Sequence, residues 1–108
     1  MPEVPLIRVF AYGLLMDAGI REGILGRKAV CRPSRVSGYA VSGSVEVEGT
    51  EYPAASASDG GDLEGGILKV TQAELGLLDD WMPDSLDRIS VTLEGTYPAW
   101  MYVLEGHR

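Results

Sequence analysis

The sequence has few of the residues on which most enzyme active sites depend. It contains one cysteine, Cys31, and one histidine, His107, which is the second-to-last residue. A single thiol cannot form an internal disulfide or, alone, a structural zinc site. A Ser-His-Asp or Cys-His site would need this histidine, and side chains near a chain end are rarely held rigidly. We therefore expect neither histidine-dependent hydrolysis nor a metal, and no other cofactor.

Positive charge and long apolar runs are also scarce. The 108 residues include nine Lys and Arg against sixteen Asp and Glu, which gives a formal net charge of −7. Because nucleic-acid binders concentrate positive charge, we expect no nucleic-acid partner. No apolar run approaches the length of a bilayer span, and the sequence does not start with the basic-then-apolar order of a secretion signal. We expect a cytoplasmic protein with no membrane partner, as a monomer or a homodimer.

The apolar residues that are present, 45% of the chain, suit one compact domain over residues 1–108. Their patterning predicts extended segments at residues 6–11, 38–44, 44–47, 51–57, 67–70, 89–93 and 97–104. The last two are predicted to form a hairpin that turns at Glu94-Gly95. Residues 56–66 are rich in glycine and other small or turn-prone residues, so we expect an exposed loop there.

Two helices are predicted between these strands. Thr71 and Glu74 match a capping box, and apolar residues then recur every three or four positions up to Met82, where Pro83 ends the helix. A weaker helix is expected to begin after Asp17 and to stop near residue 26. Hairpins outnumber crossovers in this order, which indicates an α+β domain with a mostly antiparallel, curled or closed sheet.

A tyrosine and a glycine stand where the first strand should end. Gly13 would let the main chain turn with its N–H groups exposed, and such groups can form a pocket for an oxyanion or a carboxylate. The alternative is a tight turn with the Tyr12 ring in the core. Periodicity alone favours this alternative, because most short motif matches arise by chance.

Several segments together resemble the γ-glutamylcyclotransferase-like proteins. Residues 9–15 (VFAYGLL) are similar to the family's strand followed by Tyr-Gly-x-Leu, and residues 74–82 (ELGLLDDWM) to its helix ending Leu-Asp-x-x-Glu. Further similarities, in the family's order, are Gly38-Tyr39, residues 52–55 (YPAA), residues 63–70 (LEGGILKV), Arg88 and residues 99–103 (AWMYV). The resemblance implies a small mixed, mostly antiparallel β-barrel with flanking helices and a cavity at its mouth.

The resemblance also implies a chemistry. In family enzymes the Tyr-Gly-x-Leu loop, here Tyr12, Gly13, Leu14 and Leu15, holds the γ-glutamyl or 5-oxoproline part of the substrate. The glutamate that ends the helix motif takes a proton from the substrate's α-amine, which then attacks its own γ-carbonyl and releases 5-oxoproline. The reaction needs no cofactor, because proximity within one substrate supplies much of the rate advantage.

This sequence departs from the family at that glutamate. Counting from Leu78-Asp79 places Met82 at the catalytic position, and a thioether cannot exchange a proton near neutral pH. Leu86 likewise replaces the tyrosine of the family's Tyr-x-Arg step. Losing a general base typically lowers the rate about 10²–10⁴-fold. Asp84, which follows Pro83, is the substitute we consider first; Glu64 and Asp87 are further possibilities, whereas Asp80 faces another side of the helix.

Three functional hypotheses remain open at this point. The first is a degenerate family member that binds a small γ-glutamyl or amide-type ligand, with little or no ordinary cyclotransferase activity. The alternative is an active γ-glutamyl amine cyclotransferase that releases 5-oxoproline with a relocated carboxylate. A third possibility is a structural or interaction protein whose own side chains fill the cavity.

Overall fold

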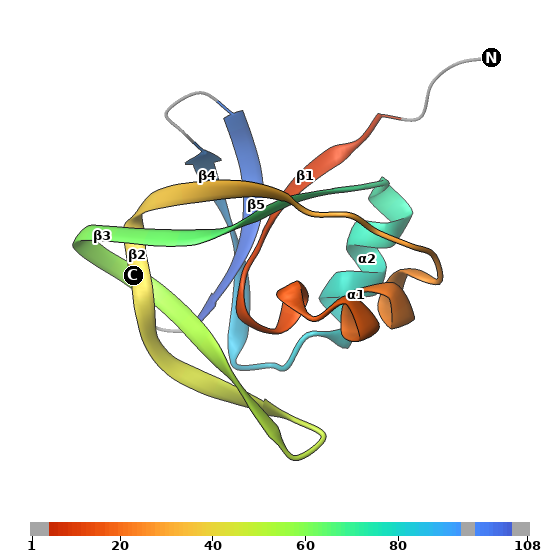
Figure 1. The fold of residues 1–108 in the computed structure, drawn as a ribbon, viewed down its shortest axis with the longest axis horizontal. Coiled ribbons are helices and arrows are strands. Elements are labelled where there is room, and N and C mark those ends of the chain that lie inside the picture. Colours follow the sequence, from red (N-terminus) through yellow and green to blue (C-terminus); the bar gives the residue numbers. More distant parts are fainter. Residues whose placement is uncertain (1–4, 94–96, 105–108) are drawn as a thin grey trace.

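The described part of the chain, residues 5–93 and 97–104 of a computed structural model, is built around a curled sheet. Its strands are β1 (Ile7–Ala11), β2 (Arg32–Val47), β3 (Thr50–Val70), β4 (Leu86–Leu93) and β5 (Tyr97–Leu104). They lie in the order β2-β3-β1-β5-β4. The β1–β5 pairing is parallel and the other pairings are antiparallel. Figure 1 shows how the long β2–β3 ribbon bends, so that the sheet forms a half-barrel.

Both predicted helices form, and both use the predicted caps. The Asp17 carboxylate accepts a hydrogen bond from the Ile20 N–H at the start of α1 (Ala18–Leu25), and Gly26 ends that helix with a φ of 72°. The capping box of α2 (Gln72–Trp81) is complete, because Thr71 and Glu74 each accept from the other's backbone N–H. A 3-10 helix, η1 (Gly13–Met16), links β1 to α1.

The buried side chains form two clusters, one on each face of the sheet. Successive residues of β1 alternate between them, since neighbouring side chains of a strand point to opposite faces: Val9 and Ala11 belong to one cluster and Phe10 to the other. The first cluster includes Leu75 and Leu78 of α2 and therefore joins the helices to the sheet. The second draws on strand and loop residues and fills the inside of the curl.

The prediction of an exposed loop at residues 56–66 was wrong. These residues belong to β3, which pairs with β2 from Arg32↔Ile67 to Val47↔Thr50, with register shifts near Gly38 and Ser42. Their small side chains serve close packing: a Cβ on Gly65 would collide with the Ala11 carbonyl oxygen and the Phe10 ring. The glycines that suggested a turn therefore let β3 lie close against the end of its neighbour β1.

The predicted C-terminal hairpin is confirmed, because β4 and β5 pair from Leu86↔Leu104 to Leu93↔Tyr97. Its predicted turn at Glu94-Gly95 lies outside the described residues, as does His107. The α+β class and the mixed, mostly antiparallel curled sheet with two flanking helices are also confirmed. None of the described helices has both the length and the apolar character needed to cross a membrane.

Candidate functional site

The turn after β1 has the conformation that its glycine allows. Tyr12 is still extended, with φ −151° and ψ 169°, and Gly13 has a φ of +55°. A Cβ atom at Gly13 would lie 2.5 Å from the Pro53 carbonyl oxygen, closer than two such atoms can approach. Positive φ and the missing space both require glycine here. The turn therefore brings η1 directly against the start of β3.

The Tyr12 side chain is part of the core. Its hydroxyl donates to the Tyr102 carbonyl oxygen at 2.6 Å and accepts from the Ala55 N–H at 2.9 Å. Burial raises the pKa of the Tyr12 phenol above its usual value, although the hydrogen bond from Ala55 acts in the opposite direction. The phenol thus joins β1, β3 and β5, and its donor and one acceptor position are already used inside the protein.

A small cavity lies between this turn and the C-terminal end of α2. The described residues of its lining are apolar except for two phenol groups: Phe10, Tyr12, Leu14, Leu15, Val45, Pro53, Ala54, Met82, Leu86 and Tyr102. The free volume inside is about 10 Å³, at or below the space that a single water molecule needs. As it stands, the cavity is filled by the protein's own side chains.

Met82 contributes directly to this filling. It is the residue that follows the last turn of α2, its N–H donates to the Leu78 carbonyl oxygen at 3.0 Å, and only 7% of its surface is exposed. The structure thus brings together Tyr12, Leu14, Leu15 and Met82, four of the residues that the sequence analysis selected. Gly13 sets the turn between them without lining the cavity.

None of the described residues that line the cavity carries a carboxylate. Asp84 is exposed in the segment between α2 and β4 and lies outside the lining, and its role as a substitute base stays a prediction. Glu64 is an exposed residue of β3 that pairs with Arg35 on β2. Asp87, in β4 opposite Val103, is half-buried and also outside the lining. No described group of three or more Asp, Glu, His or Cys residues could hold a metal ion.

Among the described residues, the carboxylate most directly linked to the cavity is Asp79, which was not one of the predicted site residues. The Tyr102 hydroxyl donates to Asp79 Oδ1 at 2.7 Å, and Arg88 Nε lies 3.3 Å from the same oxygen. The Arg88 guanidinium also stacks on the Trp100 ring at 4.4 Å. Burial, followed by the Asp79 contact, raises the pKa of Tyr102 far above its usual value. Helical spacing alone could not show that Asp79 faces the end of β5.

The chain is similar to known proteins in both sequence and fold. Residues 9–108 match the family described as "Gamma-glutamyl cyclotransferase, AIG2-like". None of the curated proteins compared with the sequence matches it significantly.

Several solved structures share the fold. One Arabidopsis thaliana protein is 24% identical with a TM-score of 0.74, and the match covers 96% of this chain and 65% of that one. A second A. thaliana protein is 22% identical with a TM-score of 0.77, over 99% of this chain and 74% of that one. A structure titled "Gamma-glutamyl cyclotransferase" is 14% identical with a TM-score of 0.71, over 96% and 69%.

At these identities the structural likeness shows a common fold. The family match adds a sequence relationship, and it extends from within β1 to the last residue. The chain therefore belongs to the gamma-glutamyl cyclotransferase, AIG2-like family.

Proposed function

We propose that this chain is a degenerate member of its family, with little or no ordinary cyclotransferase activity. The observation that carries the proposal is the lining of the cavity beside the Tyr12-Gly13 turn, which includes Met82 and, among the residues that the structure describes, no carboxylate. Cyclisation of a γ-glutamyl amine requires a group that removes a proton from the α-ammonium and passes one to the leaving amine. The Met82 thioether cannot do either.

We further propose that the cavity keeps the ability to admit a small γ-glutamyl or amide-type ligand once Met82 moves. Methionine is unbranched and has three rotatable side-chain bonds, so it adapts to new neighbours more easily than other apolar residues. It also stands at the end of α2, where no further helical turn fixes its surroundings. In this proposal Met82 occupies the ligand's space when no ligand is present.

A binding experiment with Met82→Ala tests this proposal. Removing the thioether should open the filled cavity, so 5-oxoproline should bind the variant at least about tenfold more tightly than the wild type, as a gain near 1.4 kcal/mol would give. Isothermal titration calorimetry measures both affinities. Leu77→Ala is the matched control, because Leu77 is an exposed residue of the same helix.

The outcomes separate the hypotheses. Unchanged affinity in Met82→Ala, with wild-type binding present, would place the ligand outside this cavity. No binding to either protein would favour the structural role, in which the side chains fill the cavity permanently. If Met82→Ala is too unstable, Leu86→Ala opens the same cavity from its half-buried side.

The second candidate function is an active cyclotransferase with a relocated carboxylate. The contact that favours it is the hydrogen bond from the Tyr102 hydroxyl to Asp79, because the Tyr102 ring lines the cavity. However, the Tyr102 proton points toward Asp79, and its raised pKa keeps the phenol protonated near neutral pH. Release of 5-oxoproline from γ-glutamyl amines that is abolished by Asp79→Asn or Asp84→Asn would establish this candidate.

A further inference from the structure

A second and much larger hollow lies away from this cavity. It is a groove of about 830 Å³, beside the N-terminal end of β1, and its described lining has no residue in common with that of the cavity at the Tyr12-Gly13 turn. Its lining is Leu6, Arg8, Arg27, Val30, Arg32, Ile67, Leu68, Lys69, Thr71, Glu74 and Tyr97. The described lining therefore holds four of the chain's nine Lys and Arg residues and a single carboxylate, that of Glu74.

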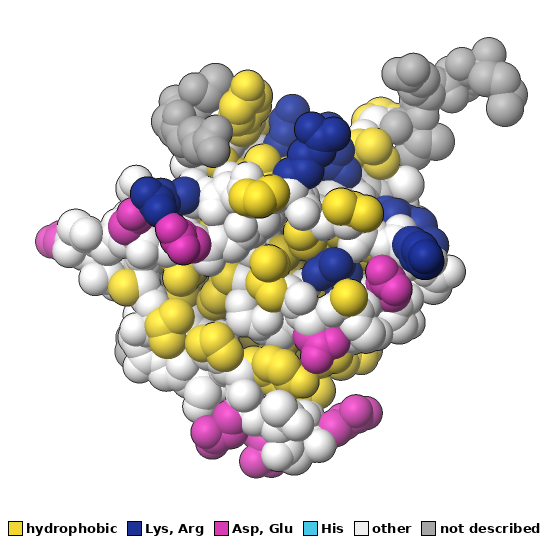
Figure 2. All heavy atoms as spheres, in the orientation of Figure 1, with side chains coloured by type: hydrophobic (Ala, Val, Ile, Leu, Met, Phe, Trp, Pro, Cys, Tyr) yellow, Lys and Arg dark blue, Asp and Glu magenta, His cyan; other side chains and the backbone are white. Residues whose placement is uncertain are grey.

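The charge in the groove contrasts with the rest of the molecule. The net charge of the chain is −7, and exposed carboxylates such as Glu46, Glu48 and Glu51 lie in or next to the turn that joins β2 and β3. Figure 2 shows a group of Lys and Arg side chains at the top of one face, Asp and Glu side chains at its lower edge, and both kinds together at the left and the right. If the positive charges were spread evenly over the surface, we would not expect four of the nine Lys and Arg residues to line one groove.

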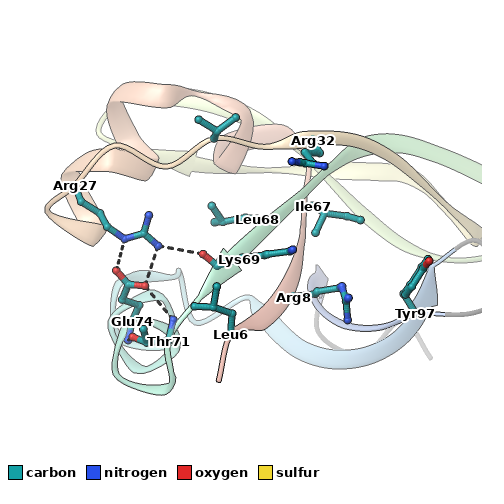
Figure 3. A pocket seen from close by; sticks show the side chains of 11 residues that line it. Leu6, Arg8, Arg27, Arg32, Ile67, Leu68, Lys69, Thr71, Glu74 and Tyr97 are labelled. Atoms are coloured by element: carbon teal, nitrogen blue, oxygen red, sulfur yellow. Dashed lines mark hydrogen bonds and ion pairs between the residues drawn. The ribbon is translucent and has the colours of Figure 1, made fainter. Parts of the chain in front are cut away.

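One of the four cations is already neutralised. Arg27 makes two hydrogen bonds to the Glu74 carboxylate, at 2.6 and 2.9 Å, and another to the Lys69 carbonyl oxygen at 3.0 Å. Figure 3 shows these bonds at one end of the groove. The ion pair of Arg27 and Glu74 thus forms one end of the groove, and Arg27 contributes little net positive charge toward a ligand.

The other three cations have no carboxylate partner among the described residues. Arg32 and Lys69 make no side-chain hydrogen bond or ion pair there, and the Arg8 guanidinium only stacks on the Tyr97 ring, 5.0 Å from its centre. Figure 3 shows Arg32 on one side of the groove, Arg8 and the Lys69 ammonium on the other, and Ile67 between them. These three groups face a common space.

The positions of these three cations in the sheet lower the stability of the fold. Arg8 and Lys69 are direct cross-strand partners in the β1–β3 ladder, and Arg32 is the partner of Ile67, two residues from Lys69. Like charges at directly opposite positions destabilise a sheet. An anion between these side chains would remove that repulsion and would gain charge-assisted hydrogen bonds from two guanidinium groups.

We propose that this groove is a binding site for a small organic phosphate. Its phosphoryl group would lie between Arg32 and the Arg8–Lys69 pair, and its apolar part would pack on Leu6, Ile67 and the Tyr97 ring. Sites for small molecules typically have volumes of about 300–1,000 Å³, with apolar walls and a few polar groups. A doubly charged phosphoryl group balances three cations better than one carboxylate does. A nucleic acid or a long acidic peptide would be repelled by the acidic surface outside the groove.

Phenyl phosphate is a suitable probe, because it combines one phosphoryl group with one apolar ring. We expect titration followed by amide NMR to shift the signals of Arg8, Arg32 and Lys69 and to leave those around Met82 unchanged. Inorganic phosphate and benzoate should each bind more weakly, since one lacks the apolar part and the other carries a single charge. Added salt should weaken the binding of all three ligands.

A double variant and a matched control decide the assignment. Arg32→Gln with Lys69→Gln should lose at least about tenfold in affinity for phenyl phosphate, because two charge-assisted contacts disappear. Arg35→Gln removes a positive charge from the same strand outside the groove and should bind like the wild type. Equal affinity of the double variant, NMR shifts outside the groove, or tighter binding of a glutamate-rich peptide than of phenyl phosphate would overturn the proposal.

Discussion

The Tyr12 hydroxyl is the residue-scale feature that holds the turn in place. It is bonded to the backbones of two strands that are far from β1 in sequence, at Ala55 and Tyr102. Tyr12→Phe keeps the ring but leaves both of these buried backbone groups without this partner. The free energy of unfolding should therefore fall by about 1–3 kcal/mol.

Urea denaturation measures this loss. Tyr39→Phe is the matched control, because Tyr39 is half-buried and its hydroxyl makes no hydrogen bond to described residues. The control should change the free energy of unfolding by less than about 0.5 kcal/mol, as ordinary surface substitutions do. Equal effects of the two substitutions would contradict a structural role for the Tyr12 hydroxyl.

Part of the candidate site could be predicted at this scale. The Tyr12-Gly13 pair after an apolar strand indicated a tight turn, and glycine is required there by its φ of +55°. The direction of the Tyr12 phenol could not be predicted, because its partners lie 43 and 90 residues away in sequence. The same applies to the contact between Asp79 and Tyr102, which depends on how β5 passes α2.

At the scale of single elements, the N-terminus of α2 combines a cap with an ion pair. Glu74 completes the capping box and also binds the Arg27 guanidinium. The pKa of Glu74 is lowered to about 2, and the hydrogen bonds from Arg27 are the largest cause. The carboxylate is therefore stabilised in its charged form. A carboxyl group whose pKa is lowered on folding stabilises the native state at pH values above its unfolded pKa.

This ion pair predicts a pH dependence of stability. Above pH 4.5, the free energy of unfolding of the wild type should exceed that of Glu74→Gln by about 1 kcal/mol. This value is modest because the Arg27 side chain is partly exposed. The difference should shrink as the pH falls from 4.5 toward 2, where Glu74 becomes protonated. Urea denaturation at a series of pH values measures it, and Glu51→Gln, at an exposed position, should show no such trend. A constant difference between wild type and Glu74→Gln would contradict the account.

The elements differed in how well local patterns predicted them. The caps of α1 and α2 were visible because capping depends on residues three or four apart. The segment at residues 56–66 was not, because its glycines respond to neighbours from other strands: a Cβ at Gly61 would lie 2.7 Å from the Tyr39 carbonyl oxygen. Small residues that permit close strand packing look like turn residues when only the local sequence is considered.

At the scale of the whole molecule, the two hollows lie toward opposite ends of β1. Tyr12 follows the strand and contributes to the filled cavity, whereas Leu6 and Arg8 contribute to the basic groove. Buried residues of β1 separate the two places. Ligands at the two sites should therefore bind independently, and variants of Arg32 or Lys69 should leave ligand binding at the Met82 cavity unchanged.

The release of 5-oxoproline by wild type and Met82→Glu tests the central claim most directly. A glutamate in this apolar lining would have a raised pKa and could accept a proton near neutral pH. Incubated with γ-glutamyl amines, the wild type should release no product above background. Met82→Glu should gain turnover of about 10²-fold or more over the Met82→Gln control, the lower end of what a general base contributes. Turnover by the wild type equal to that of Met82→Glu would contradict the claim that this cavity has lost its base.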